Sequence, residues 1–235
     1  MSTSKIEWTE VTWNPITGCT KISDGCANCY AANFARRLQA MGNARYQNGF
    51  KPTVHQDLID LPKSWKTPKK VFVNSMSDLF HEDIPTETIL KIFKTMNECP
   101  QHQFQVLTKR SERLKEIAPQ INWTDNIWMG VTVENNKYYS RIADLKETGA
   151  NIKFISAEPL LSSLSEIDLD GINWLIVGGE SGPHSRAMDK AWVDELQQIA
   201  KKAEVAFFFK QWGGFNKKKN GKLLNGKVIQ EYPME

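Results

Sequence analysis

Six short apolar runs recur along the chain, and polar residues follow each of them. The runs are residues 71–73, 104–107, 127–133, 154–155, 174–177 and 207–209. Short, mainly apolar runs of this kind are typical of strands that are buried on both faces of a sheet. The pattern therefore predicts six buried strands, each with a polar end.

Helical patterns separate most of these runs. The predicted helices are Tyr30–Met41, Pro85–Glu98, Lys137–Glu147 and Asp189–Ala203, whereas residues 159–170 have an irregular pattern. In the first helix Phe34, Leu38 and Met41 share one face, and Gly42 ends it. Strands that alternate with helical crossovers form parallel sheets. The chain is therefore expected to have an α/β fold with a parallel sheet.

The polar residues all lie at the C-terminal ends of the predicted strands. Barrels build their sites from several strand ends, whereas open doubly wound sheets concentrate them at one switch point. We therefore expect a full or partial parallel (β/α) barrel of about six to seven strands, with its site at the C-terminal mouth. The alternative is that these residues cap helices, begin loops or pair with one another at the rim.

Three cysteines lie close together near the N-terminus. Cys19, Cys26 and Cys29 have the spacing Cys-x6-Cys-x2-Cys, and glycines precede the first two. A Cys-x2-Cys pair directs two thiolates at one centre, and glycines let the backbone curl around it. Because Cys99 stands alone, the layout does not fit a disulfide framework. The three cysteines are therefore predicted to hold a metal centre in a loop at the barrel mouth.

The spacing leaves the identity of the metal open. Structural zinc takes four protein ligands, and a catalytic zinc with three usually includes histidine. A structural zinc would need one more ligand from the set His55, His81, Cys99 and His102. A 4Fe–4S cluster held by three cysteines would keep one iron open for a ligand. We therefore favour an iron–sulfur cluster and retain zinc as the alternative.

The strand ends and the residues just before the first cysteine supply the other candidate residues. Those predicted to be catalytic are Lys109, Glu158, Glu180 and Lys210. Those predicted to bind substrate are Trp13, Asn14, Arg110, Gln211 and Trp212. Lysine and arginine hold anionic groups, and tryptophan faces stack on nucleic-acid bases. Trp128, Trp174 and Trp192 are expected in the core, and His81 and His184 at the surface.

Composition narrows the class of protein. A chain of 235 residues with 40% hydrophobic content fits one domain, residues 1–235, with a lysine-rich C-terminal extension over residues 216–235. The net charge of +3 does not indicate a dedicated nucleic-acid coat protein or a membrane-surface protein. We expect a cytoplasmic protein because no apolar leader and no stretch of about 20 apolar residues is present.

Several segments resemble a phage- and island-associated family that is known by its three-cysteine motif and has no assigned function. The resemblance covers residue 6 to about 215 and includes the three cysteines with Thr12–Pro15, Ser75–Phe80, Leu107–Arg110, Gly130–Asn135, Ser156–Leu160, Gly178–Gly182 and Phe208–Gly213. The cysteines that open a partial barrel also resemble the radical S-adenosylmethionine superfamily. Its commonest spacing is Cys-x3-Cys-x2-Cys, and Tyr30 after the third cysteine resembles the spore photoproduct lyase branch.

The resemblance implies a chemistry and a set of ligands. It implies a 4Fe–4S cluster on the three cysteines and S-adenosylmethionine on the open iron, with an electron donor as partner. The residues expected to bind this cofactor are Tyr30, Asn74, Ser75, Asp78 and Ser156. By analogy with the lyase branch the substrate would be a nucleic acid or nucleotide. The competing hypotheses are a zinc-binding nucleic-acid module and a hydrolase or nuclease with structural cysteines, in which Glu158 and Glu180 act as an acid/base pair.

Overall fold

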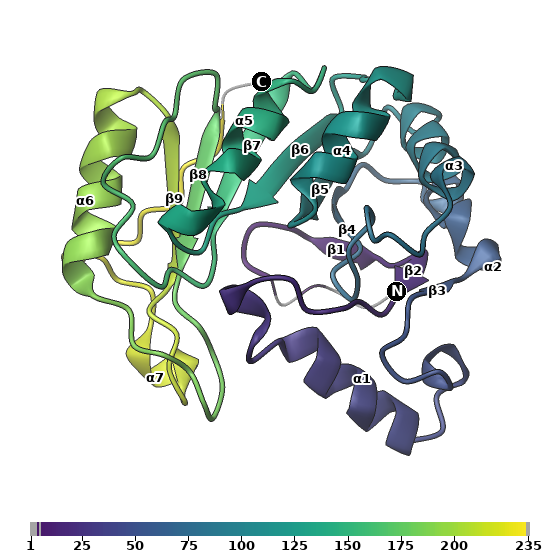
Figure 1. Cartoon of the computed structure of the whole chain (residues 1–235), viewed down its shortest axis with the longest axis horizontal. Helices are drawn as coiled ribbons and strands as arrows, with labels where there is room; N and C mark the ends of the chain where they lie inside the picture. The colour runs from purple at the N-terminus through teal and green to yellow at the C-terminus, as the bar shows by residue number, and fades with distance from the viewer. Residues whose placement is uncertain (1–3, 5, 234–235) are drawn as a thin grey trace.

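Seven parallel strands form a single curled sheet, with the strand order β1-β4-β5-β6-β7-β8-β9 (Figure 1). This computed structural model describes residue 4 and residues 6–233. The strands of the sheet are β1 (Val11–Trp13), β4 (Lys70–Val73), β5 (Gln103–Thr108), β6 (Ile127–Thr132), β7 (Ile152–Ala157), β8 (Trp174–Gly178) and β9 (Ala206–Gln211). The sheet is a half-barrel, which confirms the predicted partial (β/α) barrel.

Helices connect the strands along the outer face of the sheet. The α-helices are α1 (Tyr30–Ala40), α2 (Gln56–Ile59), α3 (Thr86–Asn97), α4 (Ser111–Ile117), α5 (Ser140–Lys146), α6 (Lys190–Lys202) and α7 (Lys217–Asn220). Short 3-10 helices are η1 (Asp24–Cys26), η2 (Ala44–Tyr46), η3 (Leu61–Ser64), η4 (Ala118–Gln120) and η5 (Asn136–Tyr138). In Figure 1 α4 and α5 lie side by side over the sheet, whereas α1 lies apart from them, below the sheet.

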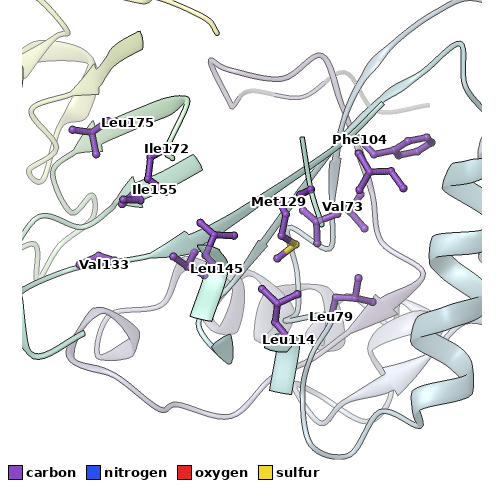
Figure 2. Packing of buried hydrophobic residues seen from close by; sticks show 14 of the residues in the cluster. Val73, Leu79, Phe104, Leu114, Met129, Val133, Leu145, Ile155, Ile172 and Leu175 are labelled. Atoms are coloured by element: carbon purple, nitrogen blue, oxygen red, sulfur yellow. The ribbon is translucent and has the colours of Figure 1, made fainter. Parts of the chain in front are cut away.

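Alternate residues of each strand enter two different hydrophobic clusters. On the helix-covered face Met129 and Ile155 pack with Leu114 of α4 and Leu145 of α5 (Figure 2). On the inner face an aromatic cluster collects Trp8, Phe72, Trp128, Phe154, Trp174, Ile176 and Phe208. We call this second cluster the aromatic floor. It fills the inside of the half-barrel, and it confirms that Trp128 and Trp174 belong to the core.

Both ends of the chain contribute to the floor. The Trp8 ring lies 6.2 Å from the Trp174 ring, and the Tyr232 ring lies 5.1 Å from it, measured between centroids. The Trp174 indole N–H donates to the carbonyl of Glu231. The C-terminal segment therefore returns to the sheet and packs on its inner face.

The outer elements differ in part from the prediction. The six predicted strands are present as β4 to β9. Strand β1 was not predicted, because it has only three residues. Strands β2 (Ile16–Thr17) and β3 (Thr53–Val54) pair separately and antiparallel. Helix α4 also has no counterpart among the predictions. No helix within the described part of the chain is long and apolar enough to cross a membrane.

Candidate metal centre at the mouth of the half-barrel

Each cysteine of the predicted metal site has a defined place at the start of the fold. Cys19 follows β2, Cys26 ends η1, and Cys29 immediately precedes α1. Gly18 has a φ of +87°, and a Cβ at this position would lie 2.1 Å from the carbonyl oxygen of Lys51. Only glycine can take this path, so Gly18 fixes how the chain enters the cysteine segment. We define the cysteine segment as residues 19–29.

The three thiols are free and half-buried, and Cys99 is separate from them in the hydrophobic core. The histidines named as further zinc ligands have other partners, since His55 pairs with Thr17 at 2.8 Å and His102 with the Pro62 carbonyl at 3.2 Å. In the part of the chain that the structure describes, no three His, Cys, Asp or Glu side chains converge on one ion position.

The donor set fits a cluster because a cubane distributes its thiolate ligands over different irons and does not need the sulfurs to meet at one atom. Cationic side chains lie close to two of the thiols. Arg110 lies beside Cys19, with 3.5 Å between Nη1 and Sγ. Burial raises the pKa of Cys26, but hydrogen bonds, the largest from Ser23, and the charge of Lys109 outweigh burial and lower it overall. Cations beside thiolates favour their ionised form, which is the form that binds metal.

Arg110 fastens the first cysteine to the end of β5. Its Nη2 donates to Thr20 Oγ1 at 2.8 Å, and its Nε donates to Glu82 Oε2 at 2.8 Å. Burial raises the pKa of Cys19 to about 11, and Asp78 adds to this, whereas Arg110 opposes it. Arg110 was predicted to bind substrate, but here its guanidinium already contacts the cysteine segment. In this arrangement it fastens the cysteine segment to the end of β5, and a role in substrate binding stays a prediction.

Asp78 joins the ends of β4 and β5. Its carboxylate accepts from Thr108 Oγ1 at 2.6 Å and from the backbone N–H of Lys109 at 3.0 Å. The backbone N–H of Phe80 donates to the same carboxylate at 3.0 Å. Asp78 was predicted to bind the cofactor, and the structure places it at the mouth with protein donors on both oxygens.

Asn74 presents a polar group that the protein leaves unused. It has a left-handed backbone, with a φ of 59°, and its Oδ1 accepts from the Ile16 N–H at 3.3 Å. Its Nδ2 is buried and has no partner among the described residues. Buried amide groups are normally paired, so this unpaired donor at a strand end makes Asn74 a candidate for hydrogen bonding to a ligand.

Ser75, which follows Asn74 in the sequence, forms hydrogen bonds with two other predicted residues, Asn14 and Tyr30. Ser75 Oγ donates to Asn14 Oδ1 at 3.1 Å, and the Tyr30 hydroxyl donates to the Ser75 carbonyl at 2.6 Å. The structure therefore brings Asn14, Tyr30 and Ser75 together where β4 ends and α1 begins.

Glu158 and Lys210 pair across the neighbouring strand β8. Lys210 Nζ lies 2.7 Å from Glu158 Oε1, and Ser156 Oγ donates to Glu158 Oε2 at 3.2 Å. Between them in the sheet is Gly178, where a Cβ would lie 2.7 Å from Glu158 Oε1. Glycine at this position therefore leaves the room in which the ion pair forms.

Glu180 binds the loop that follows it. Its carboxylate accepts from Arg186 Nε at 2.9 Å and from Asn28 Nδ2 at 3.1 Å. Burial raises the pKa of Glu180, but the hydrogen bonds from Arg186 and Asn28 outweigh burial and lower it overall. A lowered pKa makes Glu180 a poor general acid, which argues against its role in a Glu158–Glu180 hydrolytic pair.

The remaining predicted residues divide between the site and the core. Gln211 Nε2 donates to Ser181 Oγ at 2.7 Å, and Trp212 is half-buried beside it. Trp13 is fully buried, and its indole N–H donates to the Leu58 carbonyl at 2.7 Å. The prediction that Trp13 stacks on a ligand is therefore wrong, because its ring is part of the core. The surface placement of His81 is also wrong, because its side chain is fully buried.

Sequence reasoning missed two groups that hold the cysteine segment. Glu134 is fully buried and accepts from Ser23 Oγ, and Arg186 Nη1 donates to the Asp24 carbonyl at 2.9 Å. Glu134 directly follows the apolar run 127–133, so the strand-end pattern includes it. Arg186 lies in a loop after β8, and no sequence signal marks it.

The chain belongs to the family described as "Protein of unknown function (DUF5131)", which it matches over residues 3–233. No curated protein matches the sequence. Its fold is similar to two structures of spore photoproduct lyase, one of a double mutant with bound AdoMet and dinucleoside spore photoproduct and one complexed with dinucleoside spore photoproduct. Each is 13% identical to this chain, with a TM-score of 0.52. The aligned region covers 86% of this chain and 63% of the lyase chain.

A further structure, a single mutant of the same lyase, has a TM-score of 0.53 at the same identity and coverage. At this identity the similarity is one of fold. The chain spans less than two thirds of the length of these lyase structures.

Proposed function

We propose that this DUF5131 chain is a radical S-adenosylmethionine-type enzyme with a 4Fe–4S cluster on Cys19, Cys26 and Cys29. The observation that carries the proposal is the placement of three free thiols over the polar mouth of a parallel half-barrel. A bound cluster with one open iron would supply an electron to S-adenosylmethionine and so begin radical chemistry. The fold similarity to spore photoproduct lyase, including a structure with bound AdoMet, supports this assignment.

The residues at the mouth have separate roles in this proposal. The unpaired Asn74 Nδ2 would donate to the carboxylate of S-adenosylmethionine. Ser156 and Glu158, bonded to each other, would accept from its amino group or ribose. Tyr30 and Ser75, through their mutual hydrogen bond, would hold the backbone beside Asn74 in place. The aromatic floor closes the other end of the half-barrel and excludes water from the reacting groups.

For the substrate we propose a nucleic acid or nucleotide. Lys210 and Gln211 end β9 at the mouth, and the half-buried Trp212 follows them. A cation, an amide and an aromatic face together suit a phosphate and a base. Two of the structurally similar lyases have dinucleoside spore photoproduct bound, which supports the same substrate class here.

Metal analysis of protein purified without oxygen tests the proposal. The wild type is expected to be brown with about four irons per chain, and Cys29→Ala is expected to lose most of this iron. Cys99→Ala is the matched control, because Cys99 is a free cysteine in the core, away from the mouth. Its iron content should equal that of the wild type. A colourless wild-type protein with one zinc per chain would instead support the zinc-binding alternative.

A further inference from the structure

The cysteine segment is fastened to the ends of three different strands. Arg110, after β5, holds Thr20. Glu134, after β6, accepts from Ser23, and Glu180, after β8, accepts from Asn28. The Glu82 partner of Arg110 and the Arg186 partner of Glu180 have side chains that are 61% and 36% exposed, whereas Glu134 and its partner Arg141 are 0% and 7% exposed. Glu134 therefore differs from the other two attachments in being buried together with its partner Arg141.

The charge of Glu134 is already compensated inside the protein. Its Oε2 accepts from Arg141 Nη1 at 2.8 Å, and Lys109 Nζ lies 3.6 Å from Oε1. Arg141 in turn donates to the Thr132 carbonyl at 2.7 Å, so β6 and α5 hold it in place. A buried carboxylate needs such partners, and these two satisfy that need without any help from the cysteine segment. The hydrogen bond from Ser23 is therefore an addition that links a rigid group to a surface loop.

This hydrogen bond acts directly beside the second cysteine. Ser23 Oγ lies 3.4 Å from Cys26 Sγ, and the Cys26 N–H donates to the Ser23 carbonyl at 3.0 Å. Gly25 lies against the same carboxylate, because a Cβ there would be 2.4 Å from Glu134 Oε1. The turn that carries Cys26 therefore contacts Glu134 at two places: the Ser23 hydroxyl donates a hydrogen bond to it, and the backbone of Gly25 packs against it.

We propose that Glu134 is a positioning residue that sets the place of Cys26 by holding the turn at residues 23–26 against β6. This inference rests on the proposed function, in which Cys26 is a cluster ligand. Because the contact exists within the polypeptide itself, the turn would be ordered before any metal binds. Glu134 would then reduce the conformational freedom that the segment loses when it takes up a cluster.

The first test uses metal-free protein, so it does not depend on the cluster. Backbone hydrogen exchange of residues 22–26 and tryptic cleavage after Lys21 are measured in wild type and Ser23→Ala. Loss of a hydrogen bond to a carboxylate should speed both processes about tenfold. Ser163→Ala is the matched control, because Ser163 Oγ donates to the Glu195 carboxylate at 2.6 Å away from the cysteine segment. It should leave both rates at this segment unchanged.

Two further variants separate the contact from general loss of stability. Glu134→Gln keeps the size of the side chain, and Gly25→Ala places a methyl group against it. Each should loosen the turn, and combining Gly25→Ala with Ser23→Ala should add little, since both act on one contact. Thermal unfolding is measured alongside, and a variant counts only where its global transition matches the wild type.

The outcomes distinguish this inference from the proposed function. Faster exchange in Ser23→Ala, together with iron content below that of the Ser163→Ala control after anaerobic reconstitution, supports the positioning role. Unchanged exchange and cleavage in Ser23→Ala overturn it, even if the wild type binds a full cluster. Faster exchange in Ser23→Ala than in the wild type, together with a wild type that takes up no iron on reconstitution, would support the attachment and overturn the proposed function instead.

Discussion

The two ends of the inner sheet face differ sharply in chemistry, although the same strands form both. Along β7, Phe154 belongs to the aromatic floor, Ser156 follows on the same face, and Glu158 just beyond the strand pairs with Lys210 at the mouth. Alternate residues of a strand share a face, so four positions separate an aromatic ring from a carboxylate. The floor contributes stability, and the mouth gathers charges that cost stability. Substitutions at the two ends should therefore have different consequences.

The largest effect on stability is expected at the floor. Trp174 is fully buried and contacts Trp8, Trp128, Phe154, Phe208 and Tyr232. Trp174→Ala should lower the free energy of unfolding by about 3–5 kcal/mol, because it removes a large ring and leaves a cavity. Chemical denaturation measures this change. A loss below about 1 kcal/mol would show that the floor is not the main support of the inner face.

A smaller effect is expected at the mouth from removing one member of an ion pair. Lys210→Met leaves the mostly buried Glu158 without its cation and should cost about 1–3 kcal/mol in unfolding free energy. Formation of 5'-deoxyadenosine should fall about tenfold, the size expected for one charge-assisted hydrogen bond. The double variant Lys210→Met/Glu158→Leu should regain the stability but not the activity. Recovery of both would mean that the pair has only a structural role.

Stability should also depend on pH through His81, which lies near the mouth. Burial lowers the pKa of His81, and Arg110 lowers it further. Its Nδ1 accepts from the Asp83 N–H at 3.1 Å, so the folded protein holds the neutral ring. Because the folded pKa lies below the unfolded value, the stabilisation is present above about pH 6.5 and is lost as the pH falls below that value.

Denaturation at several pH values checks the contribution of His81. The wild type should lose up to about 1.4 kcal/mol per pH unit from this residue below about pH 6.5. His81→Asn keeps an acceptor for the Asp83 N–H but does not titrate, and its profile should be flatter. Identical profiles for the two proteins would assign the acid sensitivity to other groups.

The smallest effect is expected on the outer side of α1. Phe34 is 49% exposed, whereas its neighbour Ala35 is fully buried. Phe34→Ser should change the unfolding free energy by no more than about 0.5 kcal/mol. Ala35→Leu should cost about 1–3 kcal/mol because the added atoms have no space. Thermal or chemical unfolding of both variants measures the difference. A larger loss of stability in Phe34→Ser than in Ala35→Leu would show that the Phe34 side of the helix faces the protein.

The sequence predicts the sheet better than it predicts the partners within the site. Apolar runs with polar ends identify β4 to β9, because buried strands and their C-terminal residues have a local signal. In α1 the local signal misleads, since the stripe with Phe34 and Met41 is exposed and the small residues Ala31 and Ala35 face inward. Helix packing against a crowded surface selects small side chains, and hydrophobicity alone does not reveal that choice.

The contacts around the cysteines required the folded chain. Ser23 and Glu134 are far apart in sequence, as are Asn28 and Glu180, and no spacing rule links them. The sequence places Arg110 after a strand, and Arg110 does follow β5, but its contact with Cys19 depends on how the cysteine segment crosses the strand ends. His81 is predicted at the surface because it is a lone histidine near a polar loop, but tertiary packing buries it.

Formation of 5'-deoxyadenosine tests most directly whether the three cysteines support radical chemistry on S-adenosylmethionine. Protein reconstituted with iron and sulfide without oxygen is mixed with a strong reductant and S-adenosylmethionine, and 5'-deoxyadenosine is quantified. Wild type and Cys99→Ala should form it, whereas Cys29→Ala should form none above background. Absence of the product from a wild type with a full cluster, or equal amounts from Cys29→Ala, would contradict the claim.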